Sequence, residues 1–193
     1  MRFLNDLFPL ALLTAIALAA LVFANAAGAQ VPEPQGYWMG PLHGEVPDTL
    51  TGARVLGTKA LEELLQKGIP VLIDAASVLH RPENLPPAAV WMPVPHQNIP
   101  GSVWFPGIGE GKLAASLEAY YQEQLRALTG KDPDRQIVFY CHPQCWASWN
   151  AAKRALAWGY RNAAWYRDGA EGWQDADHPL VTAKPAGPAQ TSR

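Results

Sequence analysis

Hydrophobic residues along the chain fall into short continuous runs that alternate with runs at helical spacing. The continuous runs, which are typical of buried strands, lie at residues 54–56, 70–74, 102–105, 137–140 and 163–166. The helical runs lie at residues 58–68, with Thr58 as the expected N-terminal cap, and at 113–128 and 146–158. Strands that are apolar throughout and alternate with helices indicate an α/β fold, in which helices cover both faces of a central parallel sheet.

The segments outside this alternation have a different composition. Residues 1–29 combine a charged start, an apolar run and the small residues Ala27-Gly28-Ala29, a pattern typical of a cleaved secretory signal peptide. The apolar run approaches the length of a membrane span, so an uncleaved anchor stays open. We expect residues 30–53 to form an extended Pro-rich arm, 54–180 a single domain with a long Pro-rich insertion at 75–98, and 181–193 a disordered tail.

Charge and length narrow the range of partners and of architectures. The formal net charge of −2 comes without a basic block, which argues against nucleic acid and anionic lipid as partners. Contact with a membrane is expected only through an uncleaved signal. The rest of the chain, about 164 residues, is long enough to bury a core without disulfides. The leader predicts export to the periplasm, an oxidising space in which thiol pairs persist as disulfides.

The two cysteines of the chain lie close together, where a strand is followed by a helix. Cys141 follows the run at 137–140, and Cys145 directly precedes the helix at Trp146. Sites in parallel sheets lie at the carboxyl ends of strands, and Asp74 ends another strand in the same way. A loop that leads into a helix turns N–H groups inward and stabilises an anion, so a thiolate is favoured there. The pair is therefore either a structural disulfide or a reactive thiol with a partner.

Four segments of the chain resemble, in order, the hallmark segments of the rhodanese (sulfurtransferase) family. They are Val71-Leu72-Ile73-Asp74, Asn98-Ile99-Pro100-Gly101-Ser102, Val138-Phe139-Tyr140-Cys141, and the stretch from Gly159-Tyr160 to Gly172-Trp173. The third resembles the strand that delivers the catalytic cysteine of the family. The resemblance implies a rhodanese-like single domain over about residues 54–180.

A narrower resemblance concerns the cysteine loop itself. Cys141 and Cys145, followed by Trp146 and the run from Ser148 to Arg154, resemble a periplasmic subgroup known for its Cys-Trp (CXXCW) motif and its association with PQQ-dependent alcohol oxidation. Two positions depart from the family pattern. Trp146 stands where the family has an Arg five positions after its cysteine, and Asp74-Ala75-Ala76 lacks the Arg of Asp-x-Arg. Both departures predict weak turnover of thiosulfate, an anion.

Several residues of the cysteine loop and its surroundings have expected roles. Cys141 is the expected nucleophile and Cys145 the expected resolving thiol, a pair that suits disulfide exchange or persulfide resolution. His142 follows the nucleophile and is either an activating group or a solvated loop residue. Asp74 is expected to accept hydrogen bonds from loop N–H groups, and one of Trp146 and Trp149 to line the pocket. The remaining loop residues are Pro143 and Gln144, and Asp168 and Glu171 are further candidates to face the pocket.

Two classes of function stay open at this point. The first is a thiol enzyme, a sulfurtransferase or thiol–disulfide oxidoreductase, which acts on a small sulfur compound or a periplasmic thiol or redox protein. The second is a non-catalytic accessory module, in which the pair is a structural disulfide or holds Cu(I) with a remote histidine. Two cysteines are too few for a structural zinc site unless two histidines join them. The haem attachment motif Cys-x-x-Cys-His does not occur, which excludes that attachment, and we expect no cofactor.

Overall fold

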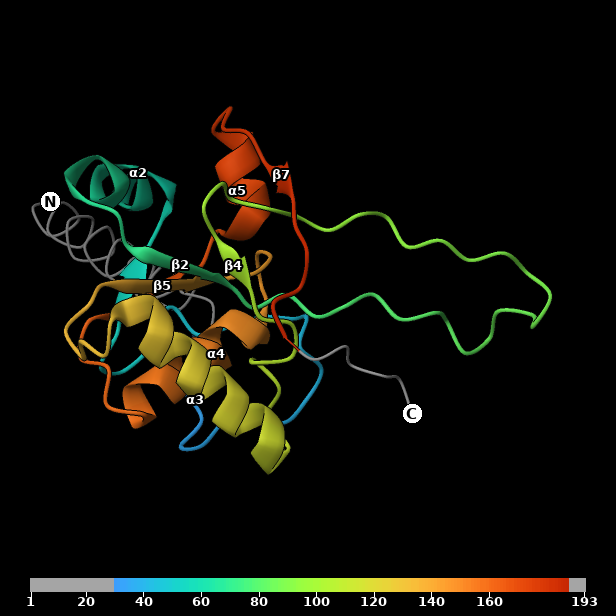
Figure 1. Cartoon of the computed structure of the whole chain (residues 1–193), viewed down its shortest axis with the longest axis horizontal. Coiled ribbons are helices and arrows are strands. Elements are labelled where there is room, and N and C mark those ends of the chain that lie inside the picture. The colour runs from blue at the N-terminus through green and yellow to red at the C-terminus, as the bar shows by residue number, and fades with distance from the viewer. Residues whose placement is uncertain (1–29, 188–193) are drawn as a thin grey trace, which may run out of the picture. The chain divides into compact units, whose positions relative to one another are not determined.

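The computed structural model of the protein describes residues 30–187 (Figure 1). The chain divides into two units after Pro32, and the second unit holds all the helices and strands described here. Its centre is a five-stranded sheet with the strand order β1-β6-β5-β2-β4, in which all pairs are parallel. The strands are β1 (Arg54–Leu56), β2 (Val71–Asp74), β4 (Val103–Trp104), β5 (Ile137–Tyr140) and β6 (Ala163–Tyr166). The predicted α/β fold is confirmed.

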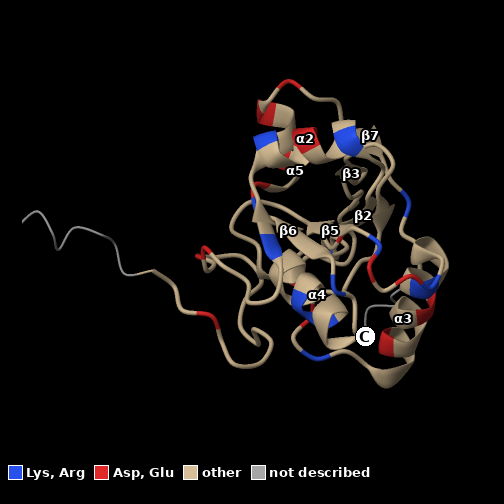
Figure 2. Ribbon diagram, turned by 90° about the vertical axis from the view of Figure 1, so that its left-hand side faces the viewer, with Lys and Arg blue, Asp and Glu red and all other residues tan. Residues whose placement is uncertain are grey.

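Helices cover both faces of this sheet, as Figure 1 shows. On one face, α2 (Thr58–Lys67) and α5 (Gly169–Asp175) bury Leu61 and Trp173 against the sheet. On the other face lie α3 (Ala115–Thr129) and α4 (Trp146–Ala157), and α4 contacts β5 and β6. Because β5 is buried along its whole length, both of its faces pack against helices. Figure 2 shows the charged residues of both signs on helices and loops, while β5 carries none.

The start of α2 differs from the expected capping arrangement. Thr58 is the first residue of the helix, and Gly57 occupies the N-cap position without a side-chain hydrogen bond. Asp168, which follows β6, supplies the acceptor instead, since its Oδ2 atom accepts from the Thr58 backbone N–H at 2.8 Å. Capping by a residue from a distant segment ties β1 and α2 to the end of β6.

The C-terminal segment is more ordered than the sequence predicts. Val181–Thr182 forms β7, which pairs antiparallel with β3 (Gln97–Asn98). Farther on, the Ala186 N–H donates to the Trp104 carbonyl at 2.8 Å. The prediction of disorder from residue 181 is therefore wrong up to residue 187, because the strand partners for this segment come from the loop before β4. Residues 188–193 lie outside the described part.

The N-terminal arm has no helix or strand in its described part, yet from Glu33 onward it packs along α4. The Trp38 backbone N–H donates to Asn150 Oδ1 at 2.8 Å, and Lys153 Nζ donates to the Pro34 carbonyl at 2.8 Å. The Trp38 ring also stacks on Trp146, with 4.3 Å between ring centroids. From Glu33 onward, the extended arm therefore lies on the domain.

The predicted signal peptide, residues 1–29, lies outside the described residues. Within residues 30–187, none of the helices combines the length and the apolar character that a membrane span requires.

The Pro-rich insertion after β2 forms a long loop that projects from the domain (Figure 1). Its base is anchored by His96, whose Nε2 atom lies 2.6 Å from Asp74 Oδ2 and whose ring stacks on Trp104 with 4.0 Å between centroids. The Trp104 indole N–H in turn donates to the Ala76 carbonyl at 2.6 Å. The loop is therefore held where it leaves and re-enters the domain, next to the carboxyl end of β2.

Candidate active site

The two cysteines form a disulfide at the carboxyl end of β5. Cys141 follows the last residue of β5, and Cys145 is the N-cap residue of α4. Their Cα atoms lie 6.4 Å apart, within the range that a disulfide spans. The bond therefore closes the loop that leads from the strand into the helix, and both sulfur atoms lie beside the N-terminus of a 12-residue helix. The partial positive charge of a helix N-terminus stabilises a thiolate at either sulfur once the bond opens.

The disulfide is almost completely covered. Cys141 is 2% exposed and Cys145 is 3% exposed, and both pack with Ala76, Ala147 and, from the arm, Leu42. The arm is fixed over the loop by two backbone hydrogen bonds. The Trp146 N–H donates to the Leu42 carbonyl at 2.7 Å, and the Gly44 N–H donates to the Gln144 carbonyl at 3.0 Å. A reagent therefore reaches the sulfur atoms only when this part of the arm moves.

The turn after β6 supports the loop from the other side. The Ala170 N–H donates to the Cys141 carbonyl at 2.8 Å. Gly169, with a φ of +67°, allows this approach, because a Cβ atom there would lie 2.8 Å from the Cys141 carbonyl oxygen and 2.6 Å from the carbonyl carbon of His142. The loop itself contains a second unusual residue, Gln144, with a φ of +50°. The backbone is thus held in one conformation between the arm and the start of α5.

Tyr140, the residue before Cys141, anchors the end of β5 to the turn at residues 98–102. The Tyr140 hydroxyl donates to Ser102 Oγ at 2.9 Å and accepts from the Ile99 N–H at 2.9 Å. Burial, and then the nearby carboxylate of Asp74, raise the pKa of Tyr140 above the usual range. The hydroxyl therefore stays neutral and keeps both bonds, which fixes the turn at residues 98–102 beside the end of β5.

His142 points to the last loop of the domain. Its Nδ1 atom lies 2.7 Å from Glu171 Oε1, and both side chains are well exposed. The ring centroid of His142 lies 6.1 Å from that of His43 on the arm. The structure thus places His142 at the surface with a carboxylate partner, and an activating role for it stays a prediction.

The Asp74 carboxylate is buried and has two partners. It accepts the Ala76 N–H at 2.9 Å through Oδ1 and contacts His96 at 2.6 Å through Oδ2. The acceptor role for a loop N–H, expected from the sequence, is present in the structure. The histidine partner was not anticipated, because it lies 22 residues away at the far end of the insertion.

The two tryptophans of α4 lie beneath the arm. Trp146 stacks on Trp38, and the Trp149 ring packs edge-on against it with 5.4 Å between centroids. The Trp149 indole N–H donates to the Thr49 carbonyl at 3.0 Å. The expectation that one of them lines the pocket is wrong for the cavity beside the cysteine loop, because both rings hold the arm instead.

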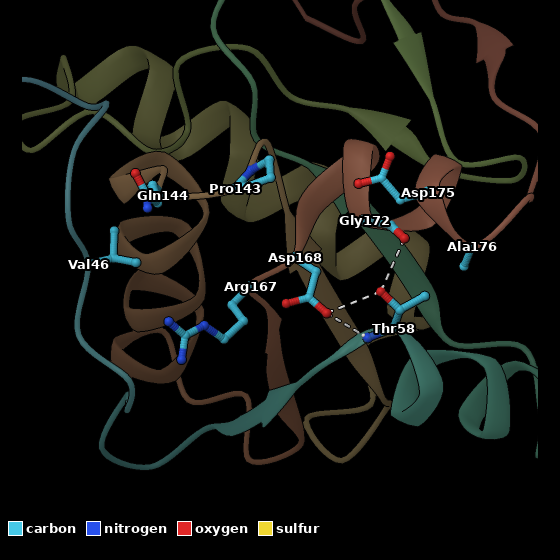
Figure 3. A pocket seen from close by; sticks show the side chains of 9 residues that line it. All are labelled: Val46, Thr58, Pro143, Gln144, Arg167, Asp168, Gly172, Asp175 and Ala176. Atoms are coloured by element: carbon cyan, nitrogen blue, oxygen red, sulfur yellow. Dashed lines mark hydrogen bonds between the residues drawn. The ribbon is translucent and has the colours of Figure 1, made fainter.

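That cavity, of about 510 Å³, opens between the cysteine loop, α2 and α5 (Figure 3). Pro143 and Gln144 form the wall toward the disulfide. Figure 3 shows Arg167 on one side and, on the other, Asp168, whose Oδ2 atom accepts from the Thr58 hydroxyl at 3.1 Å. The other lining residues are Val46, Gly172, Asp175 and Ala176.

Arg167 was missed by the sequence reasoning, although a signal was present. It follows β6 directly and thus stands at the carboxyl end of a strand, the same position that pointed to Cys141. Its Nη1 atom lies 2.6 Å from Asp48 Oδ1 of the arm. Of the two acidic candidates, Asp168 lines the cavity and Glu171 pairs with His142.

No group of three or more His, Cys, Asp and Glu side chains is placed to hold a metal ion among residues 30–187. The cysteine pair is oxidised and has no third such ligand with it in this part of the chain.

Comparisons with known proteins place this site in context. The family model described as "Rhodanese-like domain" matches residues 58–176, more than half of the chain. None of the curated proteins matches the chain.

Among solved structures, the thiosulfate sulfurtransferase of Pseudomonas aeruginosa is 19% identical with a TM-score of 0.45, over 69% of this chain and 21% of that one. The human single-domain sulfurtransferase is 22% identical with a TM-score of 0.40, over 64% of this chain and 96% of that one. The polysulfide-sulfur transferase of Wolinella succinogenes is 19% identical with a TM-score of 0.41, over 67% and 79%. This chain thus spans about a fifth of the Pseudomonas enzyme.

Proposed function

The chain belongs to the rhodanese-like domain family, and we propose that it uses Cys141 and Cys145 for sulfur transfer or thiol–disulfide exchange. The observation that carries the proposal is the disulfide between the residue after β5 and the N-cap of α4. A closed loop this short adds less stability than a long one, and a domain of this size does not need it. Exchange explains the pair better than stapling.

The proposed reaction requires only the two cysteine thiols and one sulfur compound. In the reduced protein, the Cys141 thiolate attacks the sulfane sulfur of a small donor, a persulfide forms on Cys141, and the donor leaves as a thiolate. The Cys145 thiolate then attacks Cys141 Sγ, the Cys141–Cys145 disulfide forms, and hydrosulfide leaves. With a disulfide-bonded partner protein in place of the donor, the same two attacks reduce the partner and oxidise the pair.

The sulfur donor is proposed to be something other than thiosulfate. Trp146 stands where the family has an anion-binding Arg, and its ring is occupied by stacking on Trp38. The cation Arg167, which follows β6, lines the cavity beside the cysteine loop. Its guanidinium group is paired with Asp48. An acidic cavity wall with Asp168 and Asp175 further disfavours a dianion.

Export and biological setting complete the proposal. The leader at residues 1–29 and the oxidised pair suit a periplasmic protein. The Cys-Trp motif, Cys145-Trp146, supports membership of the subgroup associated with PQQ-dependent alcohol oxidation, in which this chain would have an accessory role. N-terminal sequencing of the exported protein should begin at Gln30, and a start at Met1 in membrane fractions would indicate an anchor instead.

The chemistry is tested by mass spectrometry of the reduced protein after addition of a small persulfide donor. In the Cys145→Ser variant, we expect a persulfide to accumulate on Cys141, because the resolving thiol is missing. In the wild type, the same treatment should yield the disulfide and hydrosulfide, and in Cys141→Ser no stable adduct should form on Cys145. Adducts in equal amounts on either single variant would remove the assignment of Cys141 as the nucleophile.

A second candidate function rests on a specific observation, the cover over the disulfide. With both cysteines at most 3% exposed beneath Leu42, the pair also suits a non-catalytic accessory module that keeps its disulfide closed. The two candidates differ in whether the bond opens while the domain stays folded.

A further inference from the structure

The returning limb of the projecting loop is exposed along most of its length, and large hydrophobic residues stand at positions 90, 92 and 94. Val90 is 89% exposed, Met92 is 82% exposed and Val94 is 77% exposed, while Trp91 between them is partly covered. The residue before a proline is held in an extended conformation, and Met92 and Val94 precede Pro93 and Pro95. In an extended chain, Val90, Met92 and Val94 share one face, which the described residues leave uncovered, and Trp91 lies on the other face with the exposed Pro93 and Pro95.

The backbone of this limb has two unequal edges. Successive residues of a strand direct their N–H and C=O groups to opposite edges, so residues 90, 92 and 94 share one edge and residues 91, 93 and 95 share the other. The first edge carries three N–H groups, and none of them has a hydrogen-bond partner among residues 30–187. The second edge lacks the N–H at Pro93 and Pro95 and so cannot continue a sheet.

We propose that this limb, residues 90–95, pairs antiparallel with the same limb of a second copy of the chain. Across a two-fold axis at Met92, Met92 faces Met92 of the partner, and Val90 faces Val94 of the partner. Each of these opposed pairs directs its N–H and C=O groups to the shared edge, which lets the pair exchange both hydrogen bonds. The three apolar side chains of each copy then lie on one face of the new ribbon.

A second copy fits this limb because the pattern Val-x-Met-x-Val reads the same in both directions. A two-fold interface needs such self-complementarity, since each surface must match itself. The prolines on the outer edge stop the addition of a third strand, so the assembly closes at two chains. Because the paired surface is small compared with stable interfaces, the dimer is weak and depends on protein concentration.

The test is sedimentation velocity of the purified protein over a wide concentration range. We expect the wild type to shift from monomer to dimer as concentration rises. Met92→Pro removes one N–H from each copy and should weaken dimerisation at least about tenfold. Trp91→Pro is the matched control, since it adds a proline to the edge that is already blocked, and it should dimerise like the wild type.

Amide hydrogen exchange supplies an independent measurement on the same samples. At high concentration, the amides of Val90, Met92 and Val94 should exchange more slowly than in dilute protein, while the Trp91 amide should not change. The proposal is overturned if the protein is monomeric throughout, if Met92→Pro and Trp91→Pro associate equally, or if protection extends to both edges. Association that a different segment mediates would show the second of these results.

Discussion

Two loops leave neighbouring strands of the sheet at the same edge, and they differ in how far other segments of the chain cover them. The cysteine loop follows β5, and the projecting loop follows β2, whose last residue, Asp74, lies beside Tyr140 in the register. The first loop is covered by the arm and by the turn before α5. Among residues 30–187, the second is held to the domain near its base by the His96–Asp74 contact, and it exposes Leu79, Val90, Met92 and Val94. Both loops start at the carboxyl edge of the sheet, and they differ in the contacts that distant segments make with each of them.

Removal of the arm's main anchor should have the largest effect on stability. Asn150 is fully buried, and its amide accepts from the Trp38 N–H and donates to the Trp38 and Gly109 carbonyls. We expect Asn150→Ala to lower the free energy of unfolding by about 3–4 kcal/mol, because two partly buried backbone groups of Trp38 and the buried Gly109 carbonyl lose their partner. Urea unfolding measures this change.

The matched control for that variant is Asn84→Ala in the projecting loop, where the side chain is exposed. It should change the free energy of unfolding by less than about 0.5 kcal/mol. Similar losses for both variants would contradict the distinction between the two loops.

A smaller loss is expected at the base of the projecting loop. His96→Ala removes one of the two partners of the buried Asp74 carboxylate and the stacking on Trp104, and we expect a cost of about 2–3 kcal/mol. His80→Ala, in the exposed part of the same loop, should be nearly neutral. If the two histidine variants unfold at the same urea concentration, the base is not an anchor.

The smallest expected effect concerns access to the disulfide. Leu42→Ala should speed reduction of the bond by dithiothreitol about fivefold under native conditions, because a partly buried leucine contributes about 1 kcal/mol to holding the arm closed. Leu79→Ala removes the same group from an exposed position and should leave the rate unchanged. Equal rates in wild type and Leu42→Ala would mean that the arm does not limit access.

Local patterns were sufficient to predict the sheet and most of the helices. The apolar runs at 137–140 and 163–166 coincide with β5 and β6, and the run at 54–56 coincides with β1. The helix predicted from Trp146 is α4, and Gly130, in the left-handed conformation, ends α3 one residue later than expected. The disulfide that the sequence left open between Cys141 and Cys145 is present.

The parts that the sequence did not reveal depend on contacts between distant residues. Trp38 and Asn150 are 112 residues apart, and no local pattern indicates that they bond or that the arm would cover Trp146 and Trp149. β7 exists only because β3 provides its partner. α5 is a seven-residue helix that begins at Gly169, too short for a clear hydrophobic period.

The central question is whether the covered disulfide exchanges or only staples, and a redox titration in glutathione buffers answers it most directly. We expect a reversible transition at a potential above about −300 mV, the range below which structural disulfides lie. Loss of the bond should lower the melting temperature by only about 4–8 °C, since so short a closed loop contributes about 2 kcal/mol. A bond that resists reduction in these buffers, and whose forced reduction unfolds the domain, would contradict the proposed exchange and make the pair structural.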